Sequence, residues 1–375
     1  MIYCSITFFY DEEICKEVSI SLDYVYFCKE FLNSLNNIIV TNLIIKIIGN
    51  ISLSWRKVEI NKAQPLIREI MNLSSKIANN DNKYYFENNQ ENIIWCLTNI
   101  ISTSCNNHEH SDYLQIMKFL DNYLHNENLD IKIEIYRYVS TLHNFEGLIF
   151  EEKIKEIGID KIVNNLKMEI ELYDSLVRGK IERLINWSLQ ILIDVTAYPQ
   201  LLDKVFQFEI IEKLLSLLDK TRNYTIMNPI LIFFSKIVPT CNFFHRYKGL
   251  NLIEIILAKE EIFESDILLK ETILFIKNNT FLIQRYETLT QTIRFIIQIW
   301  KSKKDIKLNI KSLDLLCLII NSEKDLFNSN KLMEEFVQKG KMEYIENFKC
   351  NSNEKLSKQA SDFFDKFYKP YENFF

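Results

Sequence analysis

The chain has 375 residues, of which 47% are hydrophobic and 25% are charged, the balance of an ordinary folded protein. Its formal net charge of −5 excludes recognition of nucleic acid by bulk positive charge. Only 6 glycines and 5 prolines are present, so long helices joined by polar turns fit better than tight hairpins or a glycine-rich phosphate loop.

Cysteine usage and hydropathy restrict the setting in which the protein works. The 8 cysteines are scattered without a Cys-x-x-Cys pair, which indicates reduced thiols of a cytosolic or nuclear protein. Residues 1–15 lack a basic segment ahead of an apolar run, so no signal peptide is predicted. No apolar run approaches the roughly 20 residues that a membrane span requires. We therefore expect neither a membrane nor nucleic acid as a partner.

Apolar residues recur at helical spacing along the chain, and no long stretch alternates with a period of two. The segments that set the repeat are, in chain order, 41–52, 91–100, 131–144, 181–192, 228–238, 268–280, 306–319 and 354–368. Aligning the first six of these places Lys46, Trp95, Arg137, Trp187, Ile232 and Leu274 at equivalent positions. The spacing between them is 42 to 50 residues, the range of armadillo and HEAT repeats. Segments 113–124 and 209–220 are expected to be second helices of their units.

The sequence thus predicts an all-α, right-handed armadillo/HEAT-type superhelical solenoid of about eight repeats over residues 1–375. We expect a divergent N-terminal cap in 1–40, central repeats in 41–338 and a C-terminal repeat in 339–369. The last helix of each repeat should line a concave face. Residues four apart share one face of a helix, so Trp95 and Asn99 are expected to point into one groove.

Several segments resemble the importin-α (karyopherin-α) family of armadillo-repeat nuclear import adaptors. Residues 95–100, WCLTNI, resemble the Trp-Ala-Leu-x-Asn-Ile motif of that family, and residues 47–52 resemble the same motif. Residues 228–238 resemble the family repeat whose last helix begins after a proline, here Pro229. Residues 340–368 resemble the terminal armadillo repeat. The resemblance covers most of the chain from about residue 41 to 368.

This resemblance implies a nuclear import adaptor that holds the basic nuclear-localisation signal of a cargo protein in its groove. The residues that it assigns to peptide binding are Trp95, Asn99, Asn50, Trp187 and Asn278. A tryptophan face attracts a cation by about 0.5–2 kcal/mol, and an asparagine amide can both donate to and accept from a peptide group. The implied partners are cargo proteins, with importin-β and an export receptor as further transport factors, in the cytoplasm and nucleus. No catalytic residue, metal or cofactor is expected, so we do not expect an enzyme.

Other features of the sequence support an alternative, an armadillo-repeat interaction scaffold that has lost binding of nuclear-localisation signals. Lys46 and Arg137 stand where the family has tryptophan, and Ile191 follows Trp187 where asparagine is expected. We expect no basic importin-β-binding segment in residues 1–40, because Lys16 is the only basic residue before Tyr24.

Three tryptophans and one histidine pair also have simpler interpretations. Trp95 could be a core residue, since a single tryptophan in a helix is more often buried than functional. Trp55 and Trp300 fall outside the repeat register and are interpreted as packing residues. The stretch His108-Glu109-His110 is interpreted as a solvated turn rather than a metal site, because it lacks further ligands at suitable spacing.

Overall fold

The computed structural model describes most of the chain from residue 38 onward. The described residues are 28–29, 32, 38–53, 57–78, 83–103, 111–143, 147–174, 178–239, 252–280, 283, 286–302, 305–322, 336 and 341–369. Most of the expected N-terminal cap, Trp55 and the His108–His110 stretch lie outside these residues.

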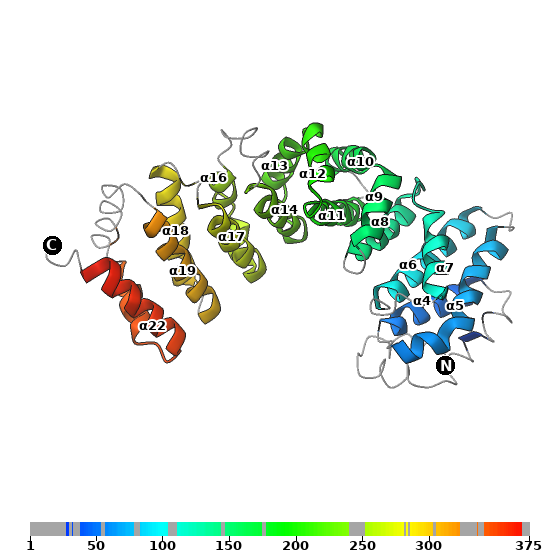
Figure 1. Cartoon of the computed structure of the whole chain (residues 1–375), viewed down its shortest axis with the longest axis horizontal. Coiled ribbons are helices and arrows are strands. Elements are labelled where there is room, and N and C mark those ends of the chain that lie inside the picture. The colour runs from blue at the N-terminus through cyan, green and yellow to red at the C-terminus, as the bar shows by residue number, and fades with distance from the viewer. Residues whose placement is uncertain are drawn as a thin grey trace. The chain divides into compact units, whose positions relative to one another are not determined.

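The regular elements within the described ranges are all helical, and the predicted fold class, an all-α armadillo/HEAT-type solenoid, is confirmed. Contacts between residues divide the chain into two compact units, 1–208 and 209–375. Each unit is a stack of helical repeats with two layers, and each is described here by itself. The last helices of successive repeats pack side by side in one layer, which we call the third-helix layer. The remaining helices form the second layer (Figure 1).

In the first unit, four long helices form the third-helix layer, each packed against the next. They are α4 (Ile38–Ser52), α6 (Lys83–Thr103), α8 (Leu129–His143) and α11 (Arg178–Val195). The second layer consists of α5 (Lys57–Ala78), α7 (Ser111–Asp121), α9 (Gly147–Ile157), α10 (Ile159–Glu171), α12 (Pro199–Val205) and the short η1 (Phe206–Phe208).

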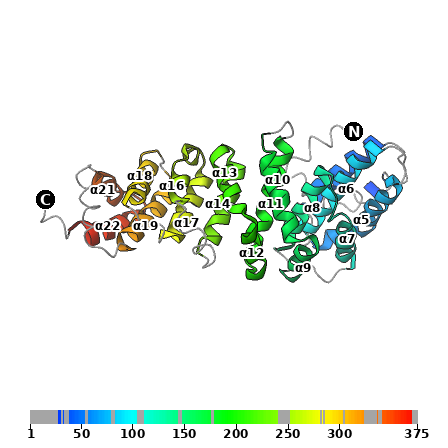
Figure 2. The same cartoon turned by 90° about the horizontal axis from the view of Figure 1, so that it is seen from above.

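The second unit repeats the same arrangement (Figure 2). Its third-helix layer consists of α14 (Tyr224–Ile237), α17 (Asp266–Asn278), α19 (Ile306–Ser322) and α22 (Glu354–Phe363), which continues into the π-helical η4 (Phe364–Tyr368). The second layer contains α13 (Ile210–Lys220), α16 (Leu252–Leu257), α18 (Tyr286–Ser302) and α21 (Met342–Lys349), while η2 (Glu260–Glu264) leads into α17.

Polar side chains cap the N-termini of three of these third helices. Asn223, Ser265 and Asn353 each accept a hydrogen bond from a backbone N–H of the first turn, in α14, α17 and α22 respectively. Such caps satisfy amide groups that the helix itself cannot pair. The cap at Asn223 corrects one expectation: α14 does not begin after Pro229, because Asn223 starts it six residues earlier and Pro229 lies inside the helix.

The interior is built from the apolar positions that the helical periodicity identified. Fully buried rings such as Phe233, Phe234 and Phe275 fill the space between the layers of the second unit. Trp300 is buried at the end of α18, where its Nε1 donates to Oγ of Ser312 at 2.7 Å. Its interpretation as a packing residue is therefore confirmed.

Candidate peptide-binding surface

All six positions that the repeat alignment made equivalent lie on third helices. Lys46 is on α4, Trp95 on α6, Arg137 on α8, Trp187 on α11, Ile232 on α14 and Leu274 on α17. The register derived from the 42- to 50-residue spacing therefore matches the layer that the structure forms. What these side chains contact differs between the two units.

The ring of Trp95 packs sideways against the preceding third helix. A Cβ atom at Gly49 of α4 would fall closer than 3.0 Å to three ring carbons of Trp95. Glycine is therefore required at this position for α4 and α6 to approach with the ring between them. Trp95 remains half-buried, so it is neither a fully buried core residue nor a freely exposed platform.

Asn99, one turn after Trp95, is only 2% exposed, and its amide is engaged within the chain. Its Nδ2 donates to the carbonyl oxygen of Gly49 at 3.0 Å, and its Oδ1 accepts from Nη1 of Arg137 at 2.6 Å. The expected role of Asn99, bonding the backbone of a bound peptide, requires an exposed amide. The structure instead places this amide between α4, α6 and α8.

Arg137 joins α8 to α6 directly, and its partner Glu134 extends the connection to α11. Its Nη2 donates to the carbonyl oxygen of Trp95 at 3.0 Å, and its Nε pairs with Oε2 of Glu134 at 2.7 Å. Oε1 of Glu134 in turn accepts from Nη2 of Arg183 on α11 at 2.9 Å. The side chains of Arg137 and Glu134 are 17% and 2% exposed, so this ion pair is largely shielded from water. We call Gly49, Asn99, Glu134, Arg137 and Arg183 the Arg137 network.

Further polar contacts join the same helices beside this network. Lys180 of α11 pairs with Asp130 of α8 at 2.6 Å. Glu91 of α6 is half-buried, and burial, together with the neighbouring carboxylates of Asp130 and Glu134, raises the pKa of Glu91. The polar groups on this part of the first unit therefore serve largely to hold its own helices together.

The other residues assigned to peptide binding differ in exposure. Asn50 on α4 and Trp187 on α11 are half-buried, whereas Asn278 at the end of α17 is exposed. Asn50, Trp95, Asn99 and Trp187 belong to the third-helix layer of the first unit. Asn278 belongs to the third-helix layer of the second unit.

The third-helix layer of the second unit has a different surface, with large apolar side chains in contact with solvent. Among the described residues of this unit, the exposed large hydrophobic side chains all lie on α14, α17 and α19. They are Tyr224, Ile267, Leu274, Ile306 and Leu318. Tyr224 is 57% exposed and Leu274 is 42% exposed. Sequence alignment identified Leu274 but missed Ile267 and Leu318. Helical periodicity could have identified both as exposed, because neither lies on the apolar face that its helix buries.

Lysines accompany these apolar residues. Lys236 lies on α14, Lys270 and Lys277 on α17, and Lys307 and Lys311 on α19. None of the five forms an ion pair with another residue that the structure describes. The layer also contains carboxylates, among them Asp314 of α19, which accepts a hydrogen bond from Nε2 of Gln359 at 2.5 Å.

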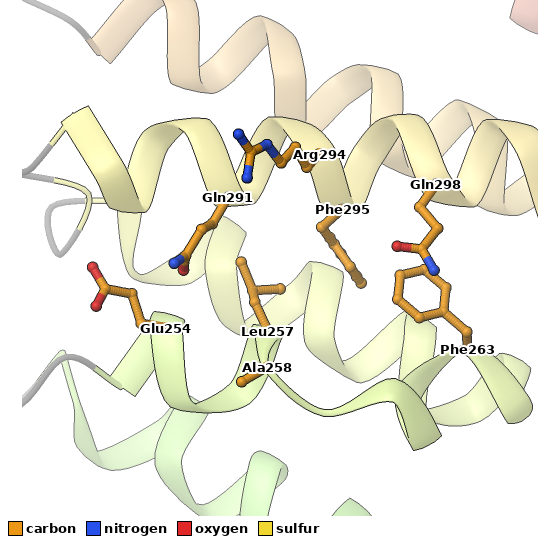
Figure 3. Close-up of a pocket in the computed structure, with 8 residues that line it drawn as sticks. All are labelled: Glu254, Leu257, Ala258, Phe263, Gln291, Arg294, Phe295 and Gln298. Atoms are coloured by element: carbon orange, nitrogen blue, oxygen red, sulfur yellow. The ribbon is translucent and has the colours of Figure 1, made fainter.

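A small pocket of about 240 Å³ lies on the other side of this unit, between α16, η2 and α18 (Figure 3). The rings of Phe263 and Phe295 lie 5.4 Å apart at one end, while Glu254 lies at the other end. Oε1 of Glu254 is already engaged by the hydroxyl of Thr288 at 2.6 Å. Because the pocket is in the second layer, it is separate from the apolar and lysine-bearing surface.

The described residues contain no cluster of histidine, cysteine, aspartate and glutamate suited to a metal ion. No helix among them is long and apolar enough to cross a membrane.

No protein-family model and no curated protein sequence matches the chain. Among solved structures, an engineered protein matches with a TM-score of 0.52 and 11% identity, over 94% of both chains. A chain from a study of a phosphorylation switch between cadherin and β-catenin matches with a TM-score of 0.54 and 12% identity, over 93% of this chain and 65% of that one. Computationally designed armadillo repeat proteins for modular peptide recognition match over 67% of this chain and 98% of theirs, with 13% identity and a TM-score of 0.45. At these identities the similarity concerns the fold, which is that of an armadillo-type repeat protein.

Proposed function

We propose that the protein is an armadillo-type interaction scaffold that binds an extended segment of a partner protein across the third-helix layer of its second unit. The observation that carries this proposal is the position of the exposed apolar side chains on α14, α17 and α19. Exposed apolar side chains gathered on one surface are typical of sites where another protein binds. In this unit they are gathered on the layer where the helices of successive repeats lie side by side.

The spacing of the helices favours an extended partner. Packed helices lie about 8–10 Å apart, and an extended chain advances about 3.3 Å per residue. A strand-like segment crossing the layer would therefore meet a new helix about every third residue. Crossing from α14 to α19 would take roughly six to seven residues, counting both ends. Asn278 is exposed at the end of α17, and we propose that its amide bonds the backbone of this segment.

The finer hypothesis of a nuclear import adaptor receives less support from the first unit. Asn99 is bonded to Gly49 and Arg137, and the guanidinium of Arg183 lies half-exposed on the next helix. A basic nuclear-localisation signal would meet these cations without the amide that was expected to hold it. Cargo with basic signals, importin-β, an export receptor and a location in cytoplasm and nucleus belong to this hypothesis and stay predictions from the family resemblance.

Selection from a phage-displayed library of random 12-residue peptides on the full-length protein tests the proposal. We expect a set of related peptides to be enriched on the wild-type protein and lost on the double variant Leu274→Asp, Leu318→Asp. The matched control is Leu148→Asp, which replaces a 78% exposed leucine on α9 and should leave the enriched set unchanged. Circular dichroism checks that all variants keep their helices. Failure to enrich any peptide, or enrichment that survives the double variant, would overturn the proposal.

A further inference from the structure

We infer that the partner segment is acidic, with Asp or Glu residues placed between apolar ones, and that it binds over the C-terminal half of α17. This inference rests on the proposed function and adds the chemistry of the partner. The observations behind it are the unpaired lysines, their placement on the helices, and the distribution of carboxylates around them.

The lysines lie in line with the exposed apolar residues. On α17, Lys270, Leu274 and Lys277 are separated by four and three residues, so all three share one face of the helix. On α14, Lys236 is exposed four residues after Ile232, the residue equivalent to Leu274. Since α14 and α17 pack side by side, Lys236 and Lys277 are exposed near the C-terminal ends of two neighbouring helices. A segment with carboxylates beside an apolar side chain matches this pattern.

The carboxylates of the unit favour the C-terminal half of α17. Glu261, Glu264 and Asp266 gather near the start of α17, beside Tyr224 and Ile267, and Arg222 already pairs with Glu261 at 3.3 Å. That end would repel an acidic segment.

Fewer carboxylates lie near the C-terminal half of α17. Glu271 is half-buried next to Lys270, and Asp314 is half-buried on the neighbouring α19, where it accepts a hydrogen bond from Gln359 and keeps its negative charge. Toward the end of α17, the described charged groups on α14 and α17 are Lys236 and Lys277. An acidic segment would therefore find complementary charge there and an apolar contact at Leu274.

The experiment uses the peptides enriched on the wild-type protein. A representative peptide is labelled with fluorescein and titrated with the full-length protein by fluorescence polarisation. It is compared with a counterpart in which every acidic residue is replaced by lysine. We expect the acidic peptide to bind and its counterpart to bind at least about tenfold more weakly. Raising the ionic strength from about 0.1 to about 1 M, which shortens the Debye length from about 10 to about 3 Å, should weaken binding of the acidic peptide several-fold.

Charge-reversal variants test whether the acidic peptide binds beside Lys236 and Lys277. Lys236→Glu with Lys277→Glu should weaken binding of the acidic peptide about tenfold or more. The matched control, Lys220→Glu with Lys301→Glu, reverses two exposed lysines of the second layer and should change the affinity less than about twofold.

Enrichment of basic or uncharged peptides would overturn this inference and leave the proposed function standing. Acidic peptides that bind equally well to both double variants would also overturn it, whereas failure to select any peptide would overturn the proposed function itself.

Discussion

Arg137 on α8 donates a 2.6 Å hydrogen bond from its Nη1 to Oδ1 of Asn99 on α6, 38 residues earlier in the chain. This bond makes Asn99 part of the framework of the first unit, since its Nδ2 bonds Gly49 on α4. The arginine that replaces an expected tryptophan is therefore a structural element that joins successive repeats.

Replacing Arg137 by alanine should destabilise the first unit by about 3–5 kcal/mol. The substitution removes one partner of the buried Glu134 and leaves Oδ1 of Asn99 without its donor, and breaking a buried ion pair has a cost of this size. The measurement is the free energy of unfolding in urea, followed by far-ultraviolet circular dichroism. Lys180→Ala, which removes a more exposed pair with Asp130, is the control and should change stability by less than about 1 kcal/mol. Equal effects of the two substitutions would contradict the framework role of Arg137.

Gly49→Ala should destabilise the protein by about 1–3 kcal/mol, although alanine is normally the better helix former. The added Cβ would overlap the ring of Trp95, and overpacking of this kind forces neighbouring groups to move. Gly179→Ala is the control, because a Cβ there meets nothing within 4 Å, and by restricting the unfolded chain it should stabilise the protein by about 0.4–1 kcal/mol. Unfolding in urea measures both.

A double-mutant cycle shows whether the ring is the cause of the Gly49→Ala effect. In the background of Trp95→Leu, which removes the ring, Gly49→Ala should lose most of its destabilising effect. If Gly49→Ala is as harmful without the ring, the close approach of Trp95 does not explain the need for glycine.

The buried carboxyl of Glu169 should make stability depend on pH. Glu169 lies on α10, and burial raises its pKa from 4.5 to about 7, although the hydroxyl of Ser188 donates to its Oε2 at 3.1 Å. The native state therefore holds this proton more tightly than the unfolded state. As pH rises from about 4.5 to about 7, the unfolded state loses the proton first, and this group lowers the free energy of unfolding by about 3 kcal/mol.

Glu169→Gln tests this dependence, because the amide keeps the shape of the side chain and does not titrate. The measured quantity is the difference in free energy of unfolding between variant and wild type, which cancels the other titrating groups. We expect this difference to shift in favour of the variant by about 3 kcal/mol between pH 4.5 and pH 8. A difference that stays constant across this range would show that Glu169 has an ordinary pKa in the folded protein.

The sequence was sufficient to predict the helices and their repeat, because apolar periodicity is a local property that recurs at 42 to 50 residues. It placed Trp95, Arg137 and Leu274 in one register, and the structure has all three on third helices. It could not predict that Asn99 would be buried. That outcome depends on a guanidinium from the next repeat and a carbonyl from the previous one, which meet only after the helices pack.

The surface of the second unit was difficult to predict for a related reason. Ile267 and Leu318 are large apolar residues of the kind that usually fills a core. Only their position relative to the buried face of each helix identifies them as exposed. The prediction that α14 begins after Pro229 is wrong, because the side chain of Asn223 caps the helix six residues earlier. The preference of proline for the start of a helix was outweighed by the hydrogen bond that the Asn223 side chain accepts from the first turn.

A basic nuclear-localisation peptide, labelled and titrated with the full-length protein, separates the import hypothesis from the scaffold. We expect no saturable binding at micromolar concentrations, because the Asn99 amide is engaged and Arg137 and Arg183 repel the peptide. Trp95→Ala serves as the companion variant and should not change this result. Saturable binding that disappears in Trp95→Ala would instead place a basic segment on the first unit. Such binding would require Asn99 to exchange its bond with Arg137 for one with the peptide, and the import adaptor would then be the better description.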